Sequence, residues 1–119
     1  MQRNIIIGKT GEDIACEYLI KNGYKIIERN WHYSKNAEID IVAEEKNELV
    51  FIEVKTRTNL NFGHPFESIN KSKIEKIYKG ILGYLRTSDK KYSSYRFDGI
   101  AIIGLKNPQI EHLKNLGEC

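Results

Sequence analysis

Apolar residues recur at helical spacing in two separate parts of the chain. The first stripe consists of Ile14, Ala15, Tyr18 and Leu19. Thr10 is suited to cap the start of this helix, and Gly23 is suited to end it. A second helix is predicted over residues 71–86, with an apolar stripe of Ile74, Ile77, Tyr78, Ile81, Leu82 and Leu85.

Short apolar runs between and after these helices predict five β-strands. They cover residues 24–33, 38–44, 48–55, 95–105 and 109–113. Residues 56–70 lack a regular pattern and predict a long mobile loop. The order α-β-β-β-α-β-β favours an α/β fold with a central mixed β-sheet flanked by helices. A length of 119 residues is typical of one domain.

A hairpin turn at residues 46–47 predicts how the second and third strands pair. In that register Asp40 lies opposite Glu53, and Glu38 lies opposite Lys55. Because side chains alternate along a strand, these four residues share one face at one end of the hairpin. The buried opposite face collects Ile39, Ile41, Ala43, Val50, Ile52 and Val54.

Two carboxylates opposed beside apolar surface repel each other, and a positive charge would remove this cost. Lys55 and a divalent cation are both candidates. Mg²⁺, with Mn²⁺ as a substitute, needs only one or two protein carboxylates, so Asp40, Glu53 and the carbonyl of Val54 are candidate metal ligands. Lys55 would then orient or deprotonate a water, or neutralise charge on a phosphate transition state. The alternative for Glu-x-Lys is a solvated ion pair.

Two further acids lie near this pattern. Glu12 is at the margin of the first helical stripe and would reach the sheet as a third carboxylate. Its alternative is a favourable acid in the first turn of a helix. Glu38 is predicted to position the ammonium of Lys55, with a plain ion pair as the alternative.

Basic residues are clustered although the net charge is only +3. The candidate phosphate contacts are Arg57, Lys71, Lys73 and Lys76. An ordinary solvated face is the alternative for these side chains.

Cysteine usage and hydropathy exclude other classes of protein. Cys16 and Cys119 form no CxxC motif, which predicts neither a disulfide framework nor a zinc site. The apolar run at residues 5–7 is too short for a signal peptide or a membrane span, so we expect a cytoplasmic protein without a membrane partner.

Several motifs together resemble the bacterial YraN-type family of endonuclease-like proteins. They are Gly11-Glu12, Asn30-Trp31, Glu38-Ile39-Asp40, Val50-Phe51-Ile52-Glu53-Val54-Lys55-Thr56-Arg57 and Arg96-Phe97-Asp98. The resemblance implies a restriction-endonuclease-like fold with the PD-(D/E)xK signature, in which Asp40, Glu53 and Lys55 occupy the signature positions. Ile39 stands where the signature has proline, and Ala37 stands where the family usually has glycine.

The resemblance also implies a Mg²⁺-dependent nuclease acting on DNA. The layout is similar to that of archaeal Holliday junction resolvases, where a glutamate of the first helix joins the site. The position of that glutamate is Glu12 here, and the substrate would include branched or junction DNA. Two alternatives remain: a non-cleaving nucleic-acid-binding or protein-interaction module on the same fold, and an enzyme that processes RNA. The sequence also leaves open whether the chain acts as a homodimer.

Overall fold

The computed structural model describes residues 2–35, 37–61, 63–104 and 106–116, with side chains from residue 10 onward. Its elements are α1 (Gln2–Lys21), β1 (Lys25–Ser34), β2 (Ala37–Glu45), β3 (Glu48–Arg57), the 3₁₀ helix η1 (Pro65–Ser68), α2 (Lys71–Thr87), β4 (Ser94–Ile103) and β5 (Gln109–Leu113). The predicted order of two helices and five strands is confirmed. The ends of these elements differ from their predicted positions by a few residues at most, except for the start of α1, which differs by more.

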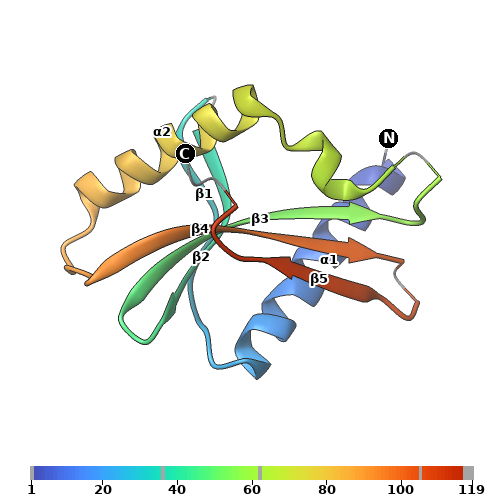
Figure 1. Ribbon diagram of the computed structural model, residues 1–119, viewed down its shortest axis with the longest axis horizontal. Coiled ribbons are helices and arrows are strands. Elements are labelled where there is room, and N and C mark those ends of the chain that lie inside the picture. The colour runs from blue at the N-terminus through green and yellow to red at the C-terminus, as the bar shows by residue number, and fades with distance from the viewer. Residues whose placement is uncertain (1, 36, 62, 105, 117–119) are drawn as a thin grey trace.

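The strands form one sheet in the order β1-β2-β3-β4-β5. Neighbouring strands are antiparallel except for β3 and β4, which are parallel. A parallel pair requires a crossover, and here α2 provides it. The predicted mixed sheet is therefore confirmed, and α1 and α2 cover its opposite faces (Figure 1).

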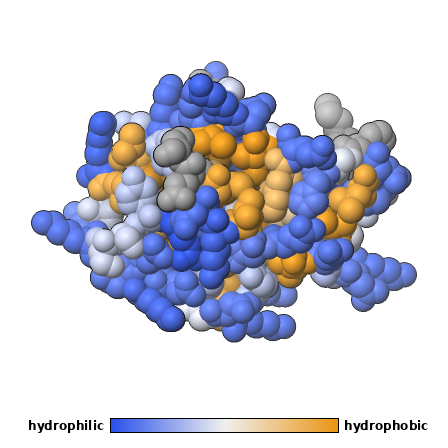
Figure 2. Space-filling view, viewed as in Figure 1, coloured by the Kyte–Doolittle hydropathy of each residue, from blue (hydrophilic) through white to orange (hydrophobic). Residues whose placement is uncertain are grey.

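Each helix packs on its own apolar layer. The layer between α1 and the sheet includes Leu19 from the helix and Ile41, Ile52 and Ile100 from the strands. The layer between α2 and the sheet includes Ile77 and Ile81 from the helix and Val42 and Phe51 from the strands. Cys16, on the face of α1 that packs on the sheet, is buried as a free thiol, whereas Cys119 lies outside the described residues. Figure 2 shows a mostly hydrophilic surface with apolar atoms gathered across the middle of the viewed face.

The start of α1 differs from the prediction. The helix begins at Gln2, so Thr10 lies inside it and is not the N-cap. No proline precedes Thr10 to prevent the helix from extending toward the N-terminus. Gly23 is confirmed as the C-terminal stop, because its φ of 89° is a left-handed conformation that glycine adopts without strain.

The predicted hairpin register is confirmed from Glu45 opposite Glu48 to Ile41 opposite Ile52. Its turn residues, Lys46 and Asn47, both have positive φ, as tight hairpin turns require.

The face predicted for Ile39 is wrong. Ile39 packs beneath α2 and Ile41 packs beneath α1, so the regular alternation of β2 breaks at Asp40. The neighbouring strand β1 is also irregular there, because Asn30 has a φ of 53°. Asp40 thus sits where the ladder departs from ideal geometry, and such departures re-aim side chains.

The segment expected to be a long loop is partly ordered into regular structure. β3 continues to Arg57, and η1 carries a capping box formed by His64 and Glu67. The mobility of residues 56–70 stays a prediction. Within the described residues, no helix is both long and apolar enough to cross a membrane.

Candidate active site

Asp40 lies where β2 departs from β3. The last backbone pair of the two strands joins Ile41 to Ile52. One step farther, Oδ2 of Asp40 accepts a hydrogen bond of 2.8 Å from the backbone amide of Val54. The side chain of Asp40 thereby takes a position that a backbone carbonyl would hold in a continued ladder, and its carboxyl group points toward β3.

Asp40 and Glu53 form a carboxyl pair just beyond the last ladder pair, although the ladder does not continue to the direct opposition that the predicted register gave them. Glu53 is buried, and its carboxyl group lies close enough to Asp40 to act on the pKa of that residue. Burial and the charge of Glu53 raise the pKa of Asp40 to about 9, although the Val54 amide acts in the opposite direction. Two adjacent carboxylates cannot both ionise cheaply in a buried setting, which favours the protonated form of Asp40.

Two lysine side chains meet the same oxygen of Glu53. Oε2 lies 3.7 Å from Nζ of Lys55 and 3.2 Å from Nζ of Lys73. Neither contact has hydrogen-bond geometry, so this buried oxygen lacks a hydrogen-bond partner among the described residues. A buried carboxylate oxygen in this state is costly unless a further positive group satisfies it.

Glu12 approaches the pair from the opposite face of the sheet. Its side chain is 19% exposed and lies 3.7 Å from Arg29. Burial raises the pKa of Glu12, against a hydrogen bond from Asn30, and the charge of Glu12 contributes to the raised pKa of Asp40. Within the described part of the chain, no three His, Cys, Asp or Glu side chains lie together as a metal-binding group.

Gly11 explains how α1 comes so close to the site. A Cβ atom at this position would lie 1.9 Å from Oγ1 of Thr56 on β3. Glycine therefore allows the helix to approach the strand that carries Glu53, and Glu12 is the next residue along. Glycine is unfavourable inside a helix, so close packing is a physical reason for its presence.

Glu38 differs from its expected position. Its side chain is 47% exposed and lies 4.0 Å from Nε2 of His32 on β1, with no ion pair to Lys55 among the described contacts. Because β2 separates from β3 at Asp40, Glu38 follows β1 instead, and the carboxylate partner of Lys55 is Glu53.

The basic side chains divide into two groups. Lys71 and Lys76 are exposed at the start of α2, and Arg57 donates a 2.9 Å hydrogen bond to the carbonyl of Thr56. Lys73 instead turns inward to Glu53, a contact that sequence reasoning missed because Lys73 and Glu53 are far apart along the chain. A role in binding nucleic acid stays a prediction for all four.

A second buried polar cluster lies around Asp98. Its carboxylate accepts hydrogen bonds from Arg96, from His112 at 2.7 Å and from the Asn115 amide at 3.1 Å. Burial alone would raise the pKa of Asp98, but these hydrogen bonds lower it below the ordinary value. The residues come from β4, β5 and the segment that follows, so the cluster holds these parts together. The Arg96-Phe97-Asp98 motif was its only sequence signal.

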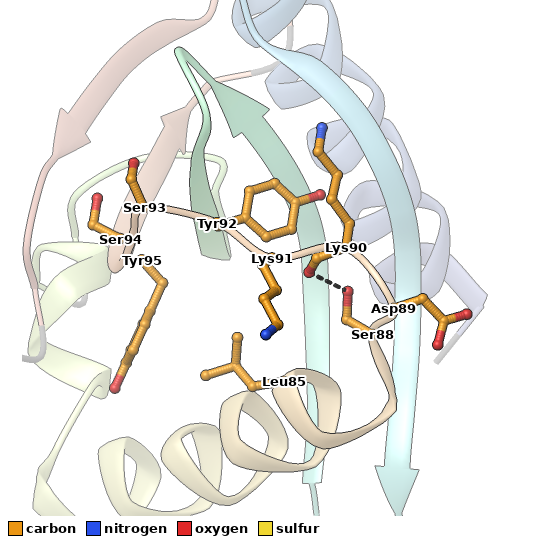
Figure 3. A pocket seen from close by; sticks show the side chains of 9 residues that line it. All are labelled: Leu85, Ser88, Asp89, Lys90, Lys91, Tyr92, Ser93, Ser94 and Tyr95. Atoms are coloured by element: carbon orange, nitrogen blue, oxygen red, sulfur yellow. Dashed lines mark hydrogen bonds between the residues drawn. The ribbon is translucent and has the colours of Figure 1, made fainter.

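A pocket of about 610 Å³ lies at the opposite end of α2. Leu85 and residues 88–95 line it, and Leu85, Lys91 and Tyr95 project toward the same space (Figure 3). None of the predicted site residues belongs to its lining.

Comparison with known proteins gives a consistent family. The family model described as "Uncharacterised protein family UPF0102" matches residues 11–102, which include the whole candidate site. A UPF0102 protein of Flavobacterium johnsoniae is 46% identical over 113 residues, covering 90% of this chain and 89% of the relative. One from Phocaeicola vulgatus is 48% identical, with 90% and 88% covered, and one from Rhodococcus opacus is 44% identical, with 97% and 98% covered. Because the match extends over most of both chains, this protein belongs to the UPF0102 family.

Proposed function

We propose that this protein is a metal-dependent nuclease that hydrolyses phosphodiester bonds in DNA. The observation that carries the proposal is the buried contact of Asp40 with Glu53, whose Oε2 has two lysine ammonium groups nearby but no hydrogen bond. Such an arrangement is costly as a purely structural element. Strongly perturbed carboxyl groups are typical of functional sites, and a cation site explains the cost here.

The residues fit a hard divalent cation. Asp40 and Glu53 would hold Mg²⁺ or Mn²⁺, together with the backbone carbonyl of Val54, and Glu12 would add charge from α1. Cation binding would relieve the repulsion between the two carboxylates and satisfy the unpaired oxygen of Glu53. A bound cation of this kind polarises a phosphate and acidifies a water.

Lys55 would act at the reacting phosphate. Its side chain is 24% exposed, so the ammonium lies between the buried acids and solvent. From there it would orient the attacking water or accept its proton, or offset the negative charge that develops on the phosphate. Each of these roles requires the amino group of lysine, as a charged ammonium or as a neutral amine with a free electron pair, which methionine lacks.

The proposed substrate is DNA, and branched or junction DNA in particular. The similarity of the signature residues to those of archaeal Holliday junction resolvases favours this substrate. Exposed Lys71 and Lys76 beside the site would supply phosphate contacts, with Arg57 at the end of β3. RNA is a weaker alternative with the same backbone chemistry.

A non-cleaving binding module is the second candidate. One observation favours it: Lys55 and Lys73 already bring positive charge to Glu53 without a cation. In this case the carboxyl pair would have a structural role, and the basic residues would hold nucleic acid or an acidic protein surface.

A cleavage assay separates the two candidates. Purified protein would be incubated with linear, flapped and four-way DNA, and with matched RNA, in Mg²⁺, in Mn²⁺ and in EDTA. The nuclease proposal expects products that depend on the metal and disappear in Glu53→Gln. Binding without products on every substrate, for wild type and Glu53→Gln alike, would favour the module.

A further inference from the structure

Lys73 reaches the site from a different element than Lys55 does. Lys55 lies on β3, two residues from Glu53, and its side chain is 24% exposed. Lys73 lies in the first turn of α2, and its side chain is 41% exposed. Nevertheless, the ammonium closer to the buried Oε2 of Glu53 belongs to Lys73, at 3.2 Å against 3.7 Å.

The backbone of Lys73 is held while its side chain can move. Asn70 caps α2, and its Oδ1 accepts a 2.9 Å hydrogen bond from the amide of Lys73. The ammonium is carried on a flexible aliphatic stem that is open to solvent along part of its length. Withdrawing this group from Glu53 therefore needs only rotation of the side chain.

Charge balance shows when that withdrawal would occur. In the metal-free protein, the ammonium of Lys73 offsets the buried carboxylate of Glu53. A divalent cation held by Asp40 and Glu53 would place a second, larger positive charge beside it. Like charges at such a distance repel strongly in a partly buried site. The side chain of Lys73 is 41% exposed against 24% for Lys55, so Lys73 has the more open path into solvent.

We propose that Lys73 is an exchangeable counter-ion, which neutralises Glu53 in the metal-free protein and is displaced toward the phosphate of the nucleic acid when the cation binds. This inference rests on the proposed function, because it requires Asp40 and Glu53 to hold the cation. Cation and nucleic acid then bind cooperatively through Lys73: the cation frees an ammonium that the phosphate uses, and the linkage is reciprocal.

The first test measures cation affinity directly. Wild type, Lys73→Met, Lys73→Arg and Lys79→Met would be titrated with Mg²⁺ by calorimetry in the absence of nucleic acid. Lys79 is the matched control, because it is an exposed lysine of the same helix outside the site. Lys73→Met is expected to bind Mg²⁺ about tenfold more tightly than wild type, as removal of a competing like charge implies. Lys73→Arg and Lys79→Met should resemble wild type.

The second test measures coupling to nucleic acid. Fluorescence anisotropy of a labelled four-way DNA would be compared for Lys55→Met and Lys55→Met/Lys73→Met, because the Lys55 change is expected to prevent cleavage. Loss of Lys73 should weaken DNA binding about fivefold in Mg²⁺ and by less than about twofold in EDTA, since only the released ammonium contacts phosphate. An equal loss in both conditions would contradict the exchange.

The outcomes separate this inference from the proposed function. If no variant binds Mg²⁺, both are overturned. If all variants bind it with one affinity, or Lys73→Met binds it more weakly, the metal site stands and the counter-ion role is wrong. If circular dichroism shows that Lys73→Met is unfolded, Lys73→Gln takes its place, because glutamine keeps a polar head group without the charge.

Discussion

Glu53 and Asp98 are the buried acidic residues of the described chain, and their surroundings differ atom by atom. Both carboxylate oxygens of Asp98 accept hydrogen bonds from the protein, and its pKa is lowered. Glu53 has an oxygen without a hydrogen bond, and it faces a second carboxyl group whose pKa is raised. A satisfied network stabilises a fold, whereas a cluster satisfied only in part requires another reason, which supports a functional role for Glu53.

Asp40→Asn should stabilise the metal-free protein. The folded pKa of Asp40, about 9, lies above its ordinary value of 3.8. Between these pH values the folded protein keeps a proton that the unfolded chain has released, so the free energy of unfolding falls as the pH rises. Asparagine removes this dependence, with a gain on the order of 1 kcal/mol near pH 8.

Denaturant unfolding in EDTA at several pH values from 5 to 9 checks this expectation. The wild type should lose stability across the range relative to Asp40→Asn, and Mg²⁺ should stabilise the wild type more than the variant. Parallel curves, with both proteins shifted alike by Mg²⁺, would identify the two acids as structural and remove the main physical support for the nuclease.

Lys55→Met should lower the cleavage rate while leaving Mg²⁺ binding largely intact. The reason is that Lys55 is assigned to the water or the transition state and not to holding the cation. A fall of about a hundredfold or more is expected for the loss of such a group. Single-turnover cleavage and Mg²⁺ calorimetry on the same preparation make the comparison. Normal cleavage by a folded variant would refute the assignment.

At the scale of elements, the approach of α1 to β3 depends on a missing side chain. Gly11→Ala should destabilise the protein by about 1–3 kcal/mol, because the added methyl group would overlap Oγ1 of Thr56. Thermal or denaturant unfolding measures the cost. The double variant Gly11→Ala/Thr56→Ala removes the obstructing atoms and should recover much of the lost stability. If the stability changes of the two single variants simply add up in the double variant, the contact with Thr56 is not the cause.

The strands β4 and β5 depend on the cluster around Asp98. Asp98→Ala should lower the free energy of unfolding by about 3 kcal/mol, because Arg96 and His112 would remain in place without the carboxylate that they contact. The exposed Asp89→Ala is the control and should change stability little. Urea unfolding measures both, and equal stabilities would mean that water replaces the carboxylate without cost.

For the whole molecule, the placement of charge matters more than its total. Charge reversal of Lys71 and Lys76 should weaken DNA binding similarly for all sequences and reduce the slope of log K against log salt by up to about 1 per lost phosphate contact. Lys21 and Lys25, which are exposed near the other end of α1, provide a control with the same change in net charge. Salt titrations by anisotropy compare the pairs, and identical slopes would show that DNA lies elsewhere.

The order of the elements could be predicted from the sequence because it depends on local periodicity. The stripe that ends at Leu85 and the stop at Gly23 are properties of single segments, and the structure confirms both. The start of α1 could not be predicted, because a favourable N-cap residue such as Thr10 does not prevent a helix from continuing through it. The face of Ile39 could not be predicted either, since the break at Asp40 involves a neighbouring strand.

The sequence by itself determined the hairpin register as far as Ile41 opposite Ile52, because a two-residue turn sets it, and so brought Asp40 and Glu53 to the end of that ladder. Only the tertiary structure decided what surrounds the pair. α1 delivers Glu12 from one face, and α2 delivers Lys73 from the other. These contacts join segments that are distant along the chain, and they depend on how closely each helix packs on the sheet. Such distances follow from the packing of the whole core, which no local pattern contains.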